Sequence, residues 1–379
     1  MRIERMGFLD WVGILCAVAL LANFVSLVIA MVRCRPRMAF LPAPADAPAV
    51  SVVRPLCGLD NFCEETLRST YELDYPVYEV IFCVASGSDP VVPLARRLMD
   101  AHPQIPSRLI IGDEPVSANP KLNNCVRGWD AARHDWIVLA DANVLMPRDY
   151  LQRLLASWRP DTGLVCSTPI GARPAGFWAE VECAFLNTLQ ARWQYVGEAV
   201  GLGFAQGKTM LWHRDLLERH GGIRALAAEL AEDAAATKLV RQAGRHVHLV
   251  DMPFEQPLGY RPVQEVWARQ LRWARLRRAT FPLFFFPEIF SGPLVIALAA
   301  SLAATSWGWS PLTTAAAVFM AWYVPEAVLA RTTGWHFSWR MPLAFLARDL
   351  ALPVLWTAAW LGHDFVWRGS AMTVREARS

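Results

Sequence analysis

The sequence predicts an α/β protein with a mainly parallel sheet and transmembrane helices at both ends of the chain. From residue 49 to about residue 260, short apolar runs rich in β-branched residues alternate with helical stretches, the pattern of βα units. Long apolar segments precede and follow this block. The hydrophobic fraction of 54% and the mean hydropathy of +0.23 are high for a soluble protein, which favours membrane insertion.

Six apolar runs are the predicted strands, at 50–53, 78–84, 108–111, 136–140, 164–167 and 247–250. Open α/β sheets bind ligands beyond the C-terminal ends of their strands. We therefore expect Arg54-Pro55, residues 86–89 and Asp141, each of which follows a strand, to converge on one crevice.

Two local features connect these elements. Pro42, Pro44 and Pro48 predict a stiff linker between the first apolar segment and the first strand. Asn61, followed by Glu64 three positions later, predicts a capping box at the start of a helix.

The first apolar segment, residues 8–32, is long enough to cross a hydrocarbon layer of roughly 30 Å as a helix. It is longer than the apolar part of a signal peptide, and no small-residue cleavage site follows it. The positive-inside rule places the next domain in the cytoplasm, although basic residues before the segment weaken the contrast. The basic residues after it are Arg33, Arg35 and Arg37, and those before it are Arg2 and Arg5.

Three more apolar segments lie at 290–306, 311–330 and 342–361, and the aromatic stretch 281–286 before them predicts an interfacial helix. Simple alternation gives four crossings and a C-terminus outside the cell. The tail arginines Arg368, Arg375 and Arg378 favour the inside instead. The number of crossings stays open, with one re-entrant segment as the alternative.

These patterns divide the chain into five parts. We expect a first membrane helix at 8–32, an α/β domain at 49–260, an amphipathic interfacial region at 261–289, membrane helices within 290–361 and a tail at 362–379.

Composition excludes several classes of function. A net charge of only +3 gives no basic field for nucleic acid. The eight cysteines form no CxxC or Cys/His pattern, so a zinc site is not expected. Only three of the 37 basic residues are lysine, and Ala, Arg and Trp are abundant. This bias is typical of GC-rich bacterial genomes, so we expect a bacterial inner-membrane protein.

Asp141 directly follows the run 136–140. A carboxylate at this place can hold Mg²⁺ or Mn²⁺, which bridge phosphate oxygens. The alternative is a turn cap, which Asp also provides. Asn143 stands where a second acid would complete an Asp-x-Asp pair, so a metal would need ligands from elsewhere.

Glu232 and Asp233 precede an alanine-rich helical stretch. Asp233 is the candidate general base, because a carboxylate can take the proton of an attacking hydroxyl. The alternative is a charge that stabilises a helix N-terminus, and spacing alone leaves both open.

Arg269 and Arg272 are three positions apart, hence on one helical face. Guanidinium groups suit phosphate oxygens and can stabilise a departing diphosphate. Trp273 can pack over that group or over the acceptor. The alternative is a basic anchor for lipid head groups, a role we assign to Arg275, Arg277 and Arg278.

Asp89 and Lys121 are further candidates for nucleotide binding. Asp89 can accept the N3–H of a uracil ring or cap the helix expected at 91–102. Lys121 lies with Asn123 in the turn 119–124, where it can contact a diphosphate or a sugar. Its alternative is a solvated helix start.

Several ordered motifs resemble the ceramide glucosyltransferases. They are Pro55-Leu56-Cys57-Gly58, the stretches 71–76 and 78–80, the stretch 119–124, Ala231-Glu232-Asp233, and Arg269-x-x-Arg272-Trp273. The likeness covers roughly residues 50 to 280 and extends more weakly to the C-terminal part. It implies a GT-A fold and an inverting transferase that uses a UDP-sugar. It also implies a set of three aspartates and a (Q/R)xxRW motif, which fall on Asp89, Asp141, Asp233 and residues 269–273.

The combined expectation is a membrane-bound enzyme that uses a divalent metal, Mg²⁺ or Mn²⁺, bound at Asp141. It transfers a sugar from a UDP-sugar, UDP-glucose being favoured, to the primary hydroxyl of a lipid, ceramide being favoured, and forms a β-glycolipid. The alternatives are transfer of N-acetylglucosamine from its UDP donor to a hopanoid polyol, a processive polysaccharide synthase, and a non-catalytic lipid-binding membrane protein.

Overall fold

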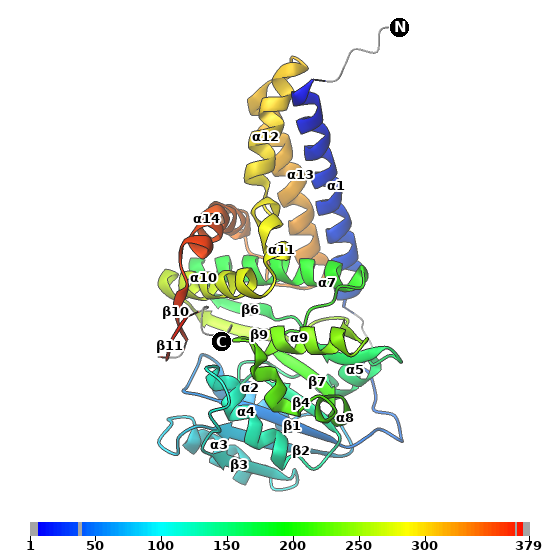
Figure 1. Ribbon diagram of the computed structural model, residues 1–379, viewed down its shortest axis with the longest axis vertical. Helices are drawn as coiled ribbons and strands as arrows, with labels where there is room; N and C mark the ends of the chain where they lie inside the picture. Colours follow the sequence, from blue (N-terminus) through cyan, green and yellow to red (C-terminus); the bar gives the residue numbers. More distant parts are fainter. Residues whose placement is uncertain (1–6, 37–39, 368–369, 374–379) are drawn as a thin grey trace.

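The computed structural model describes residues 7–36, 40–367 and 370–373. A domain built on a large sheet lies at one end of the molecule, and a bundle of long helices rises from it (Figure 1). The basic residues Arg2, Arg5 and Arg37, and the tail residues Arg368, Arg375 and Arg378, lie outside the described part of the chain.

The main sheet has seven strands in the order β3-β2-β1-β4-β7-β5-β8. Neighbouring strands run parallel except β7, which is antiparallel to both β4 and β5. The predicted, mainly parallel α/β sheet is therefore confirmed. The strands are β1 (Val50–Leu56), β2 (Tyr78–Val84), β3 (Ser107–Ile111), β4 (Trp136–Ala140), β5 (Thr162–Cys166), β7 (Thr209–His213) and β8 (His246–Leu249).

Both faces of the sheet are buried, as expected for parallel strands. Successive residues of a strand point to opposite faces, so Val53 joins the core under Trp129 of α4, whereas Val52 joins the core on the other side with Leu151 of α5. The helices of this domain are α2 (Cys63–Arg68), α3 (Val92–Ala101), α4 (Pro120–Ala131), α5 (Tyr150–Ala156), α8 (Arg214–Glu218) and α9 (Glu232–Gln242), with the short turns η1 (Ser69–Tyr71) and η3 (Ile223–Ala228).

A second layer separates the sheet from the upright bundle (Figure 1). It contains the parallel pair β6 (Ile170–Ala175) and β9 (Glu255–Tyr260). One continuous helical run crosses it as α6 (Phe177–Cys183), the π-helical η2 (Ala184–Ala191) and α7 (Arg192–Ala199), and α10 (Val263–Thr280) crosses it separately.

The upright bundle consists of α1 (Phe8–Cys34), α12 (Pro293–Ser306) and α13 (Pro311–Thr332) (Figure 1). Three helices are long and apolar enough to cross a membrane: α1, α13 and α14 (Met341–Leu361). A fourth candidate is the bent pair formed by α12 and the preceding segment Pro282–Phe290, which comprises α11 (Pro282–Phe285) and η4 (Phe286–Phe290). The expected apolar helices at both ends of the chain are thus present.

Helix α14 departs from simple alternation. It lies at the base of the bundle beside α10 (Figure 1) and packs mainly against α10 and α6. The hairpin of β10 (Asp364–Trp367) and β11 (Ser370–Thr373) follows it and also lies next to α10. Because α14 lies apart from the upright helices, this hairpin is on the same side of the bundle as the sheet domain (Figure 1).

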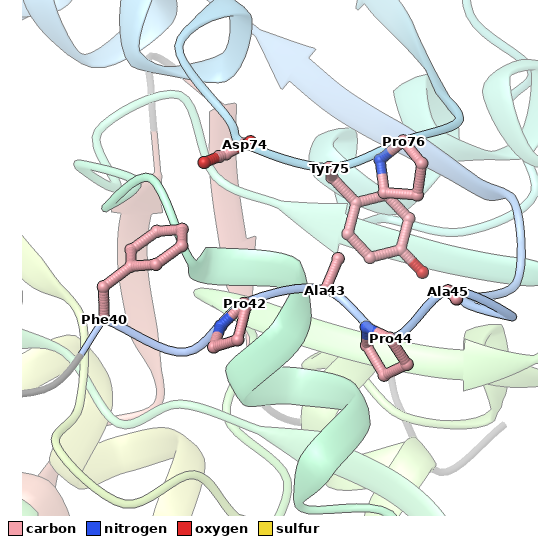
Figure 2. Close-up of a pocket in the computed structure, with 8 residues that line it drawn as sticks. All are labelled: Phe40, Pro42, Ala43, Pro44, Ala45, Asp74, Tyr75 and Pro76. Carbon is pink, nitrogen blue, oxygen red and sulfur yellow. The ribbon is translucent and has the colours of Figure 1, made fainter.

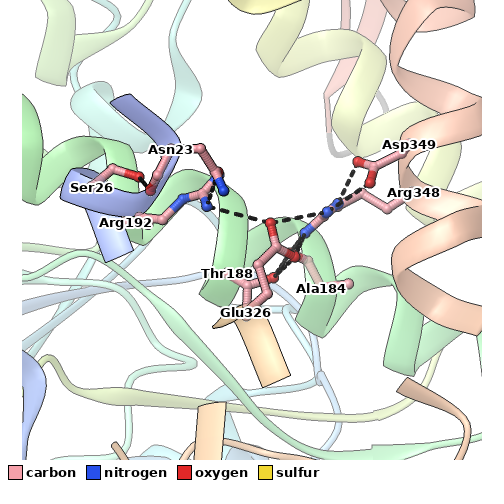
Figure 3. A network of polar contacts seen from close by, with 8 residues as sticks. All are labelled: Asn23, Ser26, Ala184, Thr188, Arg192, Glu326, Arg348 and Asp349. Carbon is pink, nitrogen blue, oxygen red and sulfur yellow. Dashed lines mark hydrogen bonds and ion pairs between the residues drawn. The ribbon is translucent and has the colours of Figure 1, made fainter. Parts of the chain in front are cut away.

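A buried ion network ties the bundle to the layer beneath it (Figure 3). Glu326 of α13 pairs with Arg348 of α14 at 3.0 Å and with Arg192 of α7 at 3.4 Å. Arg348 also pairs with Asp349 at 2.8 Å, and Arg192 donates to Asn23 of α1 at 2.6 Å. Two cations balance two anions, and Asn23, a buried polar residue inside the first apolar segment, accepts a hydrogen bond from one of the cations.

Two sequence-based details need correction or refinement. Asn61 does not cap α2: its amide donates to the carbonyls of Leu258 and Tyr260 instead, because the loop after β1 packs against β9. The proline-rich linker is not a free spacer. Residues 40–45 lie against Asp74–Pro76 around a surface pocket (Figure 2), and Tyr75 donates a hydrogen bond to the Pro48 carbonyl at 2.5 Å.

Candidate active site

Asp141 stands at the C-terminal end of β4, and each of its carboxylate oxygens meets a lysine. Lys121 Nζ lies 2.7 Å from Oδ1, and Lys208 Nζ lies 2.9 Å from Oδ2. Lys208 also donates to Asn143 Oδ1 at 3.0 Å. Burial opposes the ionised carboxylate, but the two ammonium groups outweigh it and hold the pKa of Asp141 well below its usual range. Asp141 is therefore an ionised carboxylate at physiological pH.

Lys121 is fixed by the start of α4. The side chain of Asn119 caps this helix by accepting from the Lys121 backbone N–H at 2.9 Å. The Lys121 ammonium then bridges Asp141 and Glu232, at 2.6 Å from Glu232 Oε1, and donates to the Gly207 carbonyl. Burial lowers the pKa of Lys121, yet Asp141 and Glu232 raise it above its usual value. Glu232 completes this network by accepting from the Asn119 amide at 2.6 Å.

Asp233 lies in the first turn of α9, beside that network. Its Oδ2 accepts from the Gly207 backbone N–H at 3.2 Å, and its Oδ1 accepts from the Ala234 N–H at 2.8 Å. Burial, followed by the charge of Glu232, raises the pKa of Asp233 to about 6. The side chain is only half-buried, so it is a carboxylate within reach of a ligand and with a proton affinity suited to a base near neutral pH.

Gly207 contacts both the Lys121 cluster and Asp233. A Cβ added there would lie 2.7 Å from Glu232 Oε1, 3.1 Å from Lys121 Nζ and 3.4 Å from Asp233 Oδ2. The missing side chain lets this loop run close to all three groups.

The basic helix α10 reaches the same region. Arg269 donates to the buried carboxylate of Glu182 and is near enough to help lower the pKa of Lys208, which burial chiefly lowers. Arg272 lies one turn further along and is half-buried. Trp273 packs against the small core of Cys183, Leu186 and Leu258, so in this state its ring braces α10.

Asp89 occupies the same edge of the sheet, after β2. Both of its carboxylate oxygens accept from the Gly58 N–H at 3.0 Å, and Oδ1 also accepts from the Val91 N–H at 2.9 Å. This links the loops after β1 and β2. Pro55 lies near the end of β1, paired in register with Cys83. No described contact joins Asp89 to the Asp141 cluster, and a role in uracil binding stays a prediction.

The side chain of Asn123 forms hydrogen bonds within the loop that precedes α4. Its Oδ1 accepts from the N–H groups of Val116 and Ser117, and its Nδ2 donates to the Ser117 carbonyl at 2.9 Å. This geometry explains the residue as a brace for the segment before α4.

The oxygens around Lys208 fit a divalent cation. Within the described ranges, no three His, Cys, Asp or Glu side chains gather as a metal site. Asp141 Oδ2 and Asn143 Oδ1, however, both lie within 3.0 Å of the Lys208 ammonium, so two hard oxygens already converge on one positive charge. Magnesium and manganese are often held by one or two protein oxygens together with phosphates and water.

The sequence predicts Asp141, Asp233 and Lys121 as site residues but not Lys208 or Glu182. Lysine scarcity was the available signal for Lys208, because two of the chain's three lysines bind one carboxylate. Glu182 had no signal: it lies in an apolar helical run.

Comparison with known proteins identifies the family of this chain. The model for glycosyl transferase family 21 matches residues 16–379. The chain belongs to this glycosyltransferase family. The resemblance to ceramide glucosyltransferases seen in the sequence motifs is therefore confirmed, and the protein is a glycosyltransferase with candidate membrane spans.

Two curated relatives of this family 21 member are named ceramide glucosyltransferases. Ceramide glucosyltransferase 1 of Caenorhabditis elegans is 26% identical over 335 residues, which cover 85% of this chain and 71% of the worm protein. The ceramide glucosyltransferase of Pyricularia oryzae is 23% identical, with 88% of this chain and 86% of the fungal protein covered.

A solved structure supports the GT-A fold expected for the family 21 member. It is a mannosyltransferase from Pyrobaculum calidifontis in complex with GDP-Man and Mn²⁺, with a TM-score of 0.53 and 22% sequence identity. The alignment covers 92% of this chain and 98% of that one.

Proposed function

We propose that this family 21 protein is an inverting, membrane-bound glycosyltransferase that moves a sugar from a UDP-sugar to the primary hydroxyl of a membrane lipid, with UDP-glucose and ceramide as the favoured pair. The names of the curated relatives support the pair. The observation that carries the mechanism is Asp233, a half-buried carboxylate with a pKa raised to about 6, hydrogen-bonded to the loop that also holds the Lys121 cluster.

In this mechanism the acceptor hydroxyl oxygen attacks the anomeric carbon of the donor. Asp233 takes the hydroxyl proton as the new carbon–oxygen bond forms. The bond from the anomeric carbon to the diphosphate breaks on the opposite face, so an α-linked donor gives a β-linked product. Lys208, Arg269 and Arg272 stabilise the departing negative charge. Asp141 and Asn143 would hold a divalent cation, Mg²⁺ or Mn²⁺, which supplies further positive charge to the diphosphate when bound.

The site lies below the layer formed by α10, at the base of the bundle (Figure 1). Arg33, at the end of α1 that faces the domain, pairs with Glu198 at 2.6 Å and donates to the Leu249 carbonyl at 2.8 Å. A membrane end rich in arginine is typical of the cytoplasmic side. We therefore place the domain in the cytoplasm, where nucleotide sugars are made, with the bundle in a bacterial inner membrane.

The test uses purified protein with a panel of UDP-sugars and lipid alcohols that includes ceramide and a hopanoid polyol, with products identified by mass spectrometry. Asp233→Asn should abolish transfer while UDP binding persists. Asp130→Asn is the matched control, because Asp130 pairs with Arg224 on the surface. Normal turnover by Asp233→Asn would overturn the assignment of Asp233 as the general base. A polymeric product would contradict the transfer of a single sugar.

A further inference from the structure

The two lysines at Asp141 are held in different ways. Lys121 contacts two carboxylates and a carbonyl, and its side chain is 12% exposed. Its removal would leave the buried carboxylate of Glu232 without this cation, so Lys121 is part of the framework. Lys208 has contacts to Asp141 and Asn143, the two oxygens that fit a divalent cation.

The backbone of Lys208 is anchored independently of its side chain. Its carbonyl accepts from the Asp141 N–H at 3.0 Å, where the loop enters β7. The side chain can therefore swing while its Cα stays fixed beside β4, and four rotatable bonds give the ammonium several ångströms of reach.

Charge decides which partner the ammonium takes. Without donor, Lys208 and Lys121 together offset Asp141 and Glu232. A divalent cation beside these two half-buried ammonium groups would add uncompensated positive charge. A nucleoside diphosphate arriving with that cation brings negative charge of its own, and its oxygens offer Lys208 a new acceptor.

We propose that Lys208 keeps the cation position filled in the donor-free enzyme. Its ammonium holds Asp141 and Asn143 in place, and it moves to the diphosphate when the cation and the nucleotide bind together. Lys208 thus competes with the metal when no nucleotide is present and assists it when nucleotide is bound. This inference rests on the proposed donor site at Asp141.

The experiment measures two affinities in the same variants. Free Mn²⁺ is followed by electron paramagnetic resonance with the metal alone, and UDP binding is followed by titration at saturating Mn²⁺. In Lys208→Met we expect Mn²⁺ alone to bind about tenfold more tightly, because the competing cation is gone. We expect UDP to bind about tenfold more weakly, because a charge-assisted contact is lost.

Lys238→Met is the matched control, since Lys238 pairs with Glu229 away from the site, and it should change neither affinity. Lys208→Arg keeps the charge and should retain UDP binding with weak binding of Mn²⁺ alone. Thermal unfolding of each variant checks that it is folded.

Unchanged Mn²⁺ affinity or unchanged UDP affinity in folded Lys208→Met would overturn the role of Lys208 alone, provided wild type binds UDP. Failure of wild type and Lys238→Met to bind UDP with Mn²⁺ would overturn the donor site and this inference with it.

Discussion

Arg269 donates a hydrogen bond to Glu182, a residue of α6 that lies 87 positions earlier in the chain and has no exposed side-chain surface. The arginine itself is 18% exposed. The buried carboxylate of Glu182 thus fixes the orientation of Arg269, the cation expected to bind the diphosphate. Through this contact α6 supports the site. Glu182 is in this view a positioning residue.

Glu182→Gln should therefore weaken donor use without unfolding the protein. A neutral amide holds the guanidinium less firmly than a carboxylate does, and we expect kcat/KM for the nucleotide sugar to fall by about tenfold. Steady-state kinetics measures this change, and Glu182→Asp should restore part of it. Glu65→Gln is the control, because Glu65 pairs with Arg173 at the surface. Equal kinetics for both Gln variants would contradict the role of Glu182.

The raised pKa of Asp233 predicts a pH profile. Transfer requires the deprotonated base, so kcat should rise with pH through about 6 and level off above it. Measuring kcat at saturating donor as a function of pH tests this rise. A plateau already reached just above the ordinary carboxyl pKa of 3.8 would contradict a raised pKa of the base.

The raised pKa of Asp233 also makes stability depend on pH. Activity should rise with pH, whereas this contribution to the free energy of unfolding falls. The folded protein binds the Asp233 proton more tightly than the unfolded chain does. Its contribution to stability is present below pH 3.8 and is lost as the pH rises through about 6. Asp233→Asn should remove this pH dependence from the unfolding midpoint.

The ion network in Figure 3 predicts a large effect on stability. Glu326 and Arg348 have no exposed side-chain surface, and loss of one member leaves a buried charge without its partner. Glu326→Gln should lower the free energy of unfolding by about 3–5 kcal/mol, measured by thermal unfolding in detergent. Adding Arg192→Met should recover part of the loss. Glu288→Gln, at a partly exposed pair with Arg277, should cost less than about 1 kcal/mol.

We infer three membrane crossings, by α1, α12 and α13, which predict that Asp364 lies on the side of the sheet domain and Gly7 on the opposite side. Asp364→Cys and Gly7→Cys can be labelled in sealed membranes with an impermeant thiol reagent, with the exposed Cys57 as the marker of the domain side. We expect Asp364→Cys to react together with Cys57, and Gly7→Cys to react only from the other side. Reaction of Asp364→Cys with the Gly7 side would mean that α14 spans.

The order of the sheet could not be foreseen in full. The six predicted strands do not include β7 (Thr209–His213), and its antiparallel direction depends on which neighbours it meets. The pair β6 and β9 was missed because its prolines and glycines, such as Pro174 and Gly259, are typical of loops. Both are decided by long-range pairing.

Local sequence did determine the α/β class, the apolar helices, the membership implied by the ordered motifs, and the placement of Asp141 at a strand end, because periodicity and strand-end chemistry act over a few residues. Tertiary structure alone decided that Lys121 and Lys208 share one carboxylate, that Glu182 holds Arg269, and that α14 lies across the base of the bundle. These contacts join residues far apart in the chain, and their charges acquire defined partners only when folding removes them from water.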